Sequence, residues 1–141
     1  MSDGRSRPSR GLLDTSTVIL LGRLPDSTVL PEEPLIAAIT LAELAVGPLV
    51  AADEAERARR QAHLQQAEAD FEPLPFDAAA ARAFGTVAAS LRRRGRKTAV
   101  RTYDAMIAAT ALANDLPLYT CNPDAFDGIE GLMIAAVDID D

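Results

Sequence analysis

A chain of 141 residues with 48 % hydrophobic and 25 % charged residues has the size and composition of one globular domain with its own core. Its net charge of −7 excludes non-specific binding of nucleic acid through bulk charge, so a polyanionic partner must meet a local basic patch. A single cysteine and a single histidine exclude an internal disulfide and a zinc site of the usual His/Cys kind. Carboxylates remain as the candidate chemistry.

The two ends of the chain differ from its middle. Residues 1–10 are polar and contain three arginines, which predicts a disordered tail, and residues 138–141 form a second, acidic tail. No run reaches the roughly 20 apolar residues of a membrane span, and the start of the chain lacks the apolar core of a signal peptide. We therefore expect a cytoplasmic protein without a membrane segment, whose folded domain covers residues 11–137.

Short apolar runs alternate with helical stretches along this domain. The predicted strands are the run that ends at Asp14 and residues 35–39, 73–76, 117–121 and 132–137. The predicted helices are residues 17–24, 40–48, 54–70, 78–94 and 103–114, with a short turn of helix at 123–126. Thr15, Ser16 or Thr17 is the expected cap of the first helix, Thr40 of the second and Thr102 of the fifth. Strands that alternate with helices predict a parallel sheet covered on both faces.

Acidic side chains follow several of these strands. Asp14 ends the first strand, Glu43 and Asp104 lie in the first turns of helices, and Asn122 and Asp124 follow the fourth strand. Ligands of open α/β sheets bind beyond the carboxyl ends of the strands, so we expect these groups to share one crevice. Mg²⁺ and Mn²⁺ prefer oxygen ligands, and a bound divalent cation would remove the repulsion among the carboxylates.

Each acid also has a purely structural interpretation. Asp14 could be a turn residue at the end of a strand, and Glu43 could complete a capping box with Thr40. Asp104 could simply favour the first turn of its helix through the helix dipole. The functional interpretation is preferred because the three acids occur together, between apolar runs in a consistent order.

The ordered segments LLDTSTVI, ITLAELAVG and YDAMIAATALANDLPLYTCN resemble a PIN domain and, more narrowly, the VapC toxins of bacterial toxin–antitoxin modules. The resemblance covers Leu12 to Val137. It implies a three-layer α/β/α sandwich around a central parallel sheet of about five strands. It also implies a Mg²⁺- or Mn²⁺-dependent endoribonuclease, the toxin of a type II toxin–antitoxin system, with a VapB-type antitoxin as its partner.

The resemblance also implies roles for individual residues. Asp14, Glu43 and Asp104 match the first three acids of the family, which hold the metal and carry out catalysis. Asn122 stands where the fourth acid is expected, as an amide that would anchor a second metal ion poorly. Asp124 could replace it as a ligand or could merely cap the short helix, so both one-metal and two-metal catalysis stay open.

A basic tract leads into the Asp104 helix. Its members are Arg92, Arg93, Arg94, Arg96, Lys97 and Arg101. An RNA strand needs such cations to neutralise its phosphates, so the tract is the predicted RNA contact. The alternative is a solvated helix end whose cations complement the helix dipole.

Two other functions compete with the nuclease. The chain could be a catalytically inert PIN-like module that acts only through a protein partner. It could also be a flavodoxin-like phosphatase or receiver domain with Asp14 as the phosphoryl acceptor, but such sites usually use a lysine near the fourth or fifth strand, and the only lysine is Lys97.

For the toxin we further expect a homodimer. The apolar residues Val46, Leu49 and Val50 could offer a groove for an antitoxin helix. Alternatively, these residues could pack beneath the helix at 54–70 as part of the core.

Overall fold

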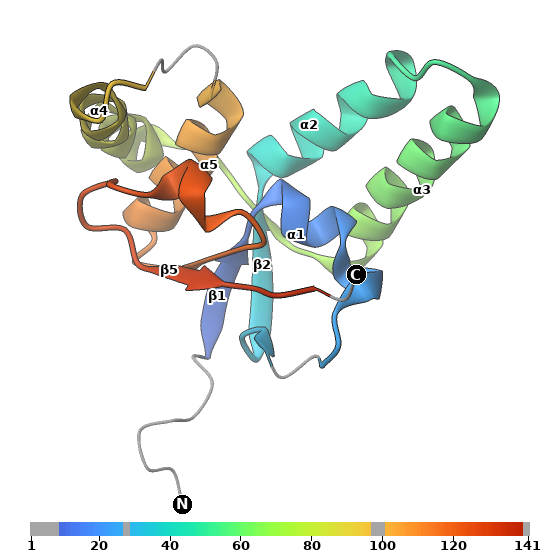
Figure 1. Cartoon of the computed structure of the whole chain (residues 1–141), viewed down its shortest axis with the longest axis horizontal. Coiled ribbons are helices and arrows are strands. Elements are labelled where there is room, and N and C mark those ends of the chain that lie inside the picture. The colour runs from blue at the N-terminus through green and yellow to red at the C-terminus, as the bar shows by residue number, and fades with distance from the viewer. Residues whose placement is uncertain (1–8, 27–28, 97–100, 140–141) are drawn as a thin grey trace, which may run out of the picture.

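Five parallel strands form the centre of the molecule, in the order β3-β2-β1-β4-β5. Figure 1 labels β1, β2 and β5 of this sheet. The computed structural model describes residues 9–26, 29–96 and 101–139. The strands are β1 Arg10–Leu13, β2 Glu33–Ala37, β3 Pro73–Leu74, β4 Leu118–Thr120 and β5 Ile134–Ala136. The predicted parallel sheet of about five strands, with the Pro73 strand at one edge, is confirmed.

Helices cover both faces of the sheet. The helices of one face are α1 Thr15–Ile19, α2 Ala38–Leu49 and α3 Glu54–Asp70, and those of the other face are α4 Ala78–Arg93 and α5 Thr102–Ala113. Two 3-10 turns, η1 Leu21–Arg23 and η4 Pro123–Phe126, complete the described elements. The predicted three-layer α/β/α sandwich is confirmed.

The alternation of side chains along β1 divides the core between the two layers. Leu12 belongs to the cluster that contains Val87 of α4 and Ile107 of α5, while Leu13 belongs to the cluster with Val18 of α1 and Leu44 of α2. Successive residues of a strand point to opposite faces, so each face of the buried sheet receives its own apolar set.

The order in which strands are added to the sheet reverses between β1 and β4. The chain moves from β1 outward to β2 and β3, and then returns to place β4 on the other side of β1. Crevices at such switch points, beyond the carboxyl ends of the strands, are the usual ligand sites of open α/β sheets. Asp14 follows β1 and Asn122 follows β4, so this crevice coincides with the predicted site.

The boundaries of the first two helices differ from the prediction. The predicted helix 17–24 is the short α1, followed by the separate turn η1, and the predicted strand 35–39 ends at Ala37, after which α2 begins at Ala38. Thr40 is therefore not a cap, and α2 continues through Pro48 to Leu49. The apolar run Leu35–Ile39 concealed this boundary, because a buried strand and a buried helix start have the same composition.

The first strand begins one residue earlier than the predicted domain. Arg10, the last residue of the predicted tail, pairs with Glu33 in the sheet, and residues 1–8 and 140–141 lie outside the described residues. Among the residues that the structure describes, no helix is long and apolar enough to cross a membrane.

Candidate carboxylate site at the switch point

Asp14 occupies the carboxyl end of β1 and is the N-cap of α1. Only 4 % of its surface is exposed. Its Oδ1 accepts hydrogen bonds from the backbone amide of Thr17 (3.0 Å) and from the Thr17 hydroxyl (2.7 Å). The Ser16 hydroxyl lies 3.0 Å from both carboxylate oxygens. The aspartate itself therefore caps the helix, and not one of the three hydroxyl residues that follow it.

A second strand end holds the other side of the same carboxylate. Thr120, the last residue of β4, donates its hydroxyl proton to Asp14 Oδ2 (2.7 Å). The Thr120 hydroxyl in turn accepts a hydrogen bond from the backbone amide of Asn122 (2.9 Å). The carboxylate is thus fixed from both sides of the switch point, in the orientation a ligand-binding group needs.

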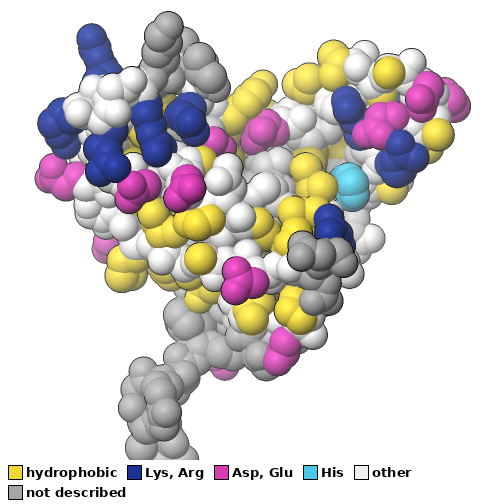
Figure 2. All heavy atoms as spheres, viewed as in Figure 1, with side chains coloured by type: hydrophobic (Ala, Val, Ile, Leu, Met, Phe, Trp, Pro, Cys, Tyr) yellow, Lys and Arg dark blue, Asp and Glu magenta, His cyan; other side chains and the backbone are white. Residues whose placement is uncertain are grey.

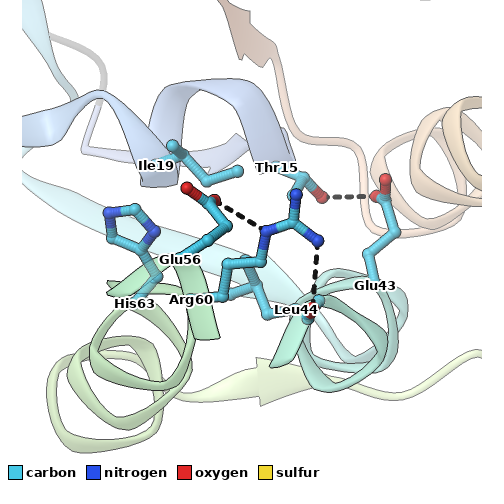
Figure 3. A pocket seen from close by; sticks show the side chains of 8 residues that line it. Thr15, Ile19, Glu43, Leu44, Glu56, Arg60 and His63 are labelled. Carbon is cyan, nitrogen blue, oxygen red and sulfur yellow. Dashed lines mark hydrogen bonds and ion pairs between the residues drawn. The ribbon is translucent and has the colours of Figure 1, made fainter. Parts of the chain in front are cut away.

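Glu43 reaches the site from the second turn of α2. The Thr15 hydroxyl donates to Glu43 Oε1 (2.7 Å), as Figure 3 shows, and lies 3.0 Å from the buried hydroxyl of Thr40. The predicted capping box is therefore wrong, because Thr40 and Glu43 both interact with Thr15 of the neighbouring helix. The start of α2 has no side-chain cap.

Asp104 reaches the site from the first turn of α5. Its side chain is half-buried, and the guanidinium of Arg101, the N-cap residue of α5, acts on it as a charge of opposite sign. Thr102, the expected cap, is instead the first residue of the helix.

The negative charge of Asp14 acts on both of the other carboxylates. Burial raises the pKa of Glu43, and the negative charges of Asp104 and Asp14 raise it further, against the lowering effect of the Thr15 hydrogen bond. Burial also raises the pKa of Asp104, helped by the charge of Asp14 and opposed by the guanidinium of Arg101. The ionised forms of Glu43 and Asp104 are therefore disfavoured, in part by the negative charge of Asp14.

This environment fits a hydrated divalent cation. Within the described residues, no three Asp, Glu, His or Cys side chains are grouped closely enough to surround an ion by themselves. Mg²⁺ usually binds only one or two carboxylates directly and keeps several waters, so a closed cage of side chains is not required. Asp14, Glu43 and Asp104 supply the oxygen donors and the negative charge that such an ion needs.

The two candidates for the fourth position lie on the surface beside this cluster. Asn122 is exposed and is the N-cap residue of η4, although its side chain makes no capping bond. Asp124 is also exposed, within the first turn of η4, so it is not the cap of that turn. The charges that shift the pKa values of Glu43 and Asp104 do not include Asp124.

Two arginines of the predicted RNA-binding tract are paired within the chain. Arg94 Nη2 lies 2.8 Å from Asp127 Oδ2, and Arg93 Nη2 lies 3.4 Å from Glu130 Oε1. Both carboxylates belong to the segment that leads from η4 to β5. These ion pairs are exposed and contribute little stability, but they reduce the charge available to an RNA strand.

The other members of the tract have different surroundings. Arg92 is exposed at the end of α4, and Arg96 is half-buried, with its Nη1 atom lacking a hydrogen-bond partner among the described residues. Arg101 lies next to Asp104 and so belongs to the carboxylate site itself. Lys97 lies outside the described residues.

Three threonines organise the site in roles that the sequence did not predict: Thr17 and Thr40 were expected only as helix caps, and Thr120 was given no role. Thr17, Thr40 and Thr120 are fully buried, and each bonds to a site residue or to its direct neighbour. Buried hydroxyls must find partners, so a threonine at the end of an apolar strand, as in the segment LYT before Asn122, was a usable signal.

The family model for the PIN domain matches residues 12–132. The chain belongs to the PIN domain family. It is 40 % identical to Ribonuclease VapC5 of Mycobacterium tuberculosis over 92 % of its own length and 97 % of that protein. It is also 36 % identical to Ribonuclease VapC8 of the same species, over 72 % of its own length and 89 % of that protein. The predicted resemblance to the VapC ribonucleases is confirmed.

Solved PIN-domain structures have the same architecture. The chain matches the VapBC-5 toxin–antitoxin structure of Mycobacterium tuberculosis with a TM-score of 0.78 and 39 % identity, over 92 % of this chain and all of that one. It matches the DNA-bound VapBC structure of Salmonella typhimurium with a TM-score of 0.67 and 29 % identity, over 89 % and 96 % of the two chains.

Proposed function

We propose that this PIN domain is the toxin of a VapBC-type toxin–antitoxin pair and that it hydrolyses RNA phosphodiester bonds with the help of Mg²⁺ or Mn²⁺. The proposal rests on three carboxylates at the switch point: Asp14 directly follows β1, Glu43 lies on α2 and Asp104 on α5, and the negative charge of Asp14 acts on both of the other acids. The 40 % identity to a ribonuclease of the same family supports RNA as the substrate.

Each carboxylate has a task that follows from its surroundings. A bound divalent cation would polarise a phosphate oxygen and lower the pKa of a bound water. Asp14, fixed by Thr17 and Thr120, has the most rigid position and sets the orientation of the ligand oxygens. Glu43 and Asp104 are less constrained, and one of them accepts the proton of the attacking water.

The substrate phosphate needs a positive charge as well as the cation. Arg101 lies beside Asp104 at the start of α5, where a phosphate approaching the carboxylates would pass its guanidinium. Arg92 and Arg96 extend this positive surface along the end of α4. The chain therefore attracts RNA locally in spite of its overall charge of −7.

The antitoxin is the proposed protein partner. Val46, Leu49 and Val50 are 43 %, 86 % and 65 % exposed, so the alternative in which they pack under α3 as core is wrong. Exposed apolar side chains at the end of a helix are suited to an amphipathic helix of a partner. We propose that the antitoxin covers this surface, and that the free toxin is a cytoplasmic homodimer.

Sequencing of RNA 5′ ends after brief induction tests the nuclease. The wild-type chain should produce new 5′ ends at defined positions, and Asp14→Asn should produce none. The asparagine keeps an oxygen for the cap of α1, so a loss of cleavage cannot be attributed to a lost helix. Equal end profiles for the two proteins would contradict the proposal and favour an inert PIN-like module that acts through its partner.

A further inference from the structure

A pocket of about 310 Å³ lies next to the carboxylates, between α1, α2 and α3. Thr15 and Glu43 form one wall, and Glu56, Arg60 and His63 of α3 form the other (Figure 3). The pocket therefore shares two residues with the candidate catalytic site but extends away from the basic tract of α4. Nothing in the proposed cleavage chemistry uses its α3 wall.

Arg60 is held in a fixed position in this pocket. Its Nε donates to Glu56 Oε2 (2.8 Å), and its Nη1 donates to the backbone carbonyl of Gly47 (3.0 Å). Its methylene stem lies against Gly47 of α2, where an added Cβ would come within 3.1 Å of the Arg60 Cδ atom. Such constraints remove the rotamer freedom that a long side chain otherwise loses on binding a ligand.

The guanidinium retains binding capacity. Its Nη2 atom has no hydrogen-bond partner among the described residues, and the group extends across the pocket toward the Thr15–Glu43 pair in Figure 3. Glu56 also pairs with Arg59, so two cations share this one carboxylate, which leaves Arg60 only partly neutralised by it. Glu43 is the second acid that lines the pocket. A pre-positioned, undersaturated guanidinium suits the two oxygens of a phosphate.

Basic side chains thus lie on both sides of the acids. Figure 2 shows Lys and Arg side chains gathered over α4 and, separately, over α3, with the outline of the molecule hollowed between them. On the side of α4 and α5, Arg101 lies beside Asp104. On the side of α3, Arg60 lines the same pocket as Glu43. An RNA strand that crosses the carboxylates from the α4–α5 side would next meet the pocket that Glu43 and Arg60 line.

We propose that Arg60 binds a backbone phosphate of the RNA adjacent to the scissile one, with the neighbouring nucleotide in the pocket lined by His63. The inference rests on the proposed ribonuclease function. Arg60 is a substrate-binding residue in this scheme, so its loss should raise KM for RNA and leave kcat largely unchanged.

Arg60→Gln and its neighbour Arg59→Gln form a matched pair for the test. Both remove one cation from α3 and one partner of Glu56, but Arg59 does not line the pocket. Binding of single-stranded RNA is measured by fluorescence anisotropy across a salt series in the Asp14→Asn background. Loss of one phosphate contact should make the slope of log K against log[salt] shallower by about 0.7 for Arg60→Gln, with no such change for Arg59→Gln.

A second measurement avoids any change at Arg60. The Asp14→Asn chain is treated with phenylglyoxal, which modifies arginines, with and without RNA, and the modified peptides are identified by mass spectrometry. RNA should protect Arg60 and leave Arg59 reactive. Equal protection of the two arginines, or equal salt slopes for the two variants, would overturn the inference.

Two further outcomes separate this inference from its basis. If Arg60→Gln weakens binding of the antitoxin while RNA binding keeps its wild-type salt slope, the pocket belongs to the protein partner and the inference is wrong. If the wild-type chain does not cleave RNA at all, the proposed function itself fails. Cleavage that depends on Asp14 but is indifferent to Arg60 overturns only the inference.

Discussion

Asp14 and Asp104 are both acids of one site, yet their surroundings have opposite consequences for stability. Asp14 is the cap of α1 and accepts hydrogen bonds from buried hydroxyls, so its carboxylate is integrated into the fold. Asp104 makes no comparable set of contacts, and burial together with the charge of Asp14 raises its pKa. One acid therefore stabilises the metal-free protein, and the other acts against it.

Substitution of these two acids should separate stability from activity. Asp14→Ala removes a helix cap and leaves buried hydroxyls without their acceptor, which should lower the free energy of unfolding by about 2 kcal/mol. Asp104→Asn removes only a repelled charge and should raise it slightly in EDTA. Both variants should lose metal-dependent cleavage of RNA. Urea unfolding and a cleavage assay on the purified proteins measure the two effects, and wild-type cleavage by either variant would contradict the assignment.

The pKa values of Glu43 and Asp104 predict how stability depends on pH. In the folded chain both values lie above the ordinary ones of 4.5 and 3.8. The folded state therefore binds the carboxyl protons of Glu43 and Asp104 more tightly than the unfolded state does. The contribution of the two groups to stability falls as pH rises from the ordinary pKa values through the raised ones. In EDTA, Glu43→Gln and Asp104→Asn should each flatten this part of the stability profile, measured by urea unfolding from pH 4 upward. An unchanged slope would mean that burial and the neighbouring charges do not raise the pKa values of these two acids in solution.

The amide at position 122 should limit the affinity for a cation. Asn122→Asp places a charged oxygen donor beside the end of β4 and should tighten Mn²⁺ binding measured by isothermal titration. Asp124→Asn should weaken binding only if Asp124 serves as a ligand, and its exposed position outside the coupled group of acids argues for a small effect. Unchanged affinity in both variants would show that neither residue is a metal ligand.

At the scale of elements, α4 and α5 end in the same type of turn but with different residues. Gly95 follows α4 with φ 74°, and Asp115 follows α5 with φ 53°. At the end of α5, the amide of Asp115 donates to Leu112 and that of Leu116 donates to Ala111, which is the pattern of a Schellman turn. Glycine adopts the left-handed conformation at this position without strain, whereas aspartate does not.

Exchange at these two positions should therefore have opposite effects. Asp115→Gly should stabilise the chain by about 0.5 kcal/mol, since relief of backbone strain outweighs the added entropy of the unfolded state. Gly95→Ala should destabilise it by about 1 kcal/mol or more. Urea unfolding in EDTA measures both, and a destabilised Asp115→Gly would show that the aspartate side chain makes an important contact at this turn.

The accuracy of the sequence prediction follows the amount of local signal in each element. The helix predicted at 54–70 begins and ends as expected, because Asp53 caps it and no glycine or proline interrupts it. The start of α2 was misplaced because nothing local marks it: Ala37 makes no side-chain cap, and Thr40 and Thr15 form contacts across 25 residues of chain. The acids of the site were identifiable by type and order, while the partners of the threonines that orient them became visible only through long-range packing.

At the scale of the whole molecule, function requires a negative chain to bind a negative polymer. The charge of −7 disfavours RNA over the surface as a whole, while Arg101 lies beside Asp104 and Arg60 lines the pocket beside Glu43, so a cation stands next to each of these two acids. Such a distribution favours a strand that enters the crevice over one that lies elsewhere on the surface. It also makes the crevice easy to block, because one protein that covers the α2–α3 edge would close one side of the path.

The proposed antitoxin provides such a block, and its binding can be tested against an exposed control residue. Expressed alone, the toxin should inhibit growth, and co-expression of the small open reading frame beside its gene should restore growth and co-purify with it. Leu49→Asp should weaken this complex by about tenfold, which corresponds to about 1.4 kcal/mol, because an exposed apolar side chain at the proposed interface is replaced by a charge.

Met133→Asp is the matched control, since Met133 is also an exposed apolar residue but lies just before β5. It should leave the affinity for the antitoxin unchanged, and both variants should keep RNA cleavage in the absence of the partner. Light scattering of the free toxin tests the proposed homodimer in the same preparations. If the neighbouring protein fails to bind the wild-type toxin in a pull-down, the toxin–antitoxin assignment is wrong, while the PIN fold and its carboxylate site still predict a nuclease.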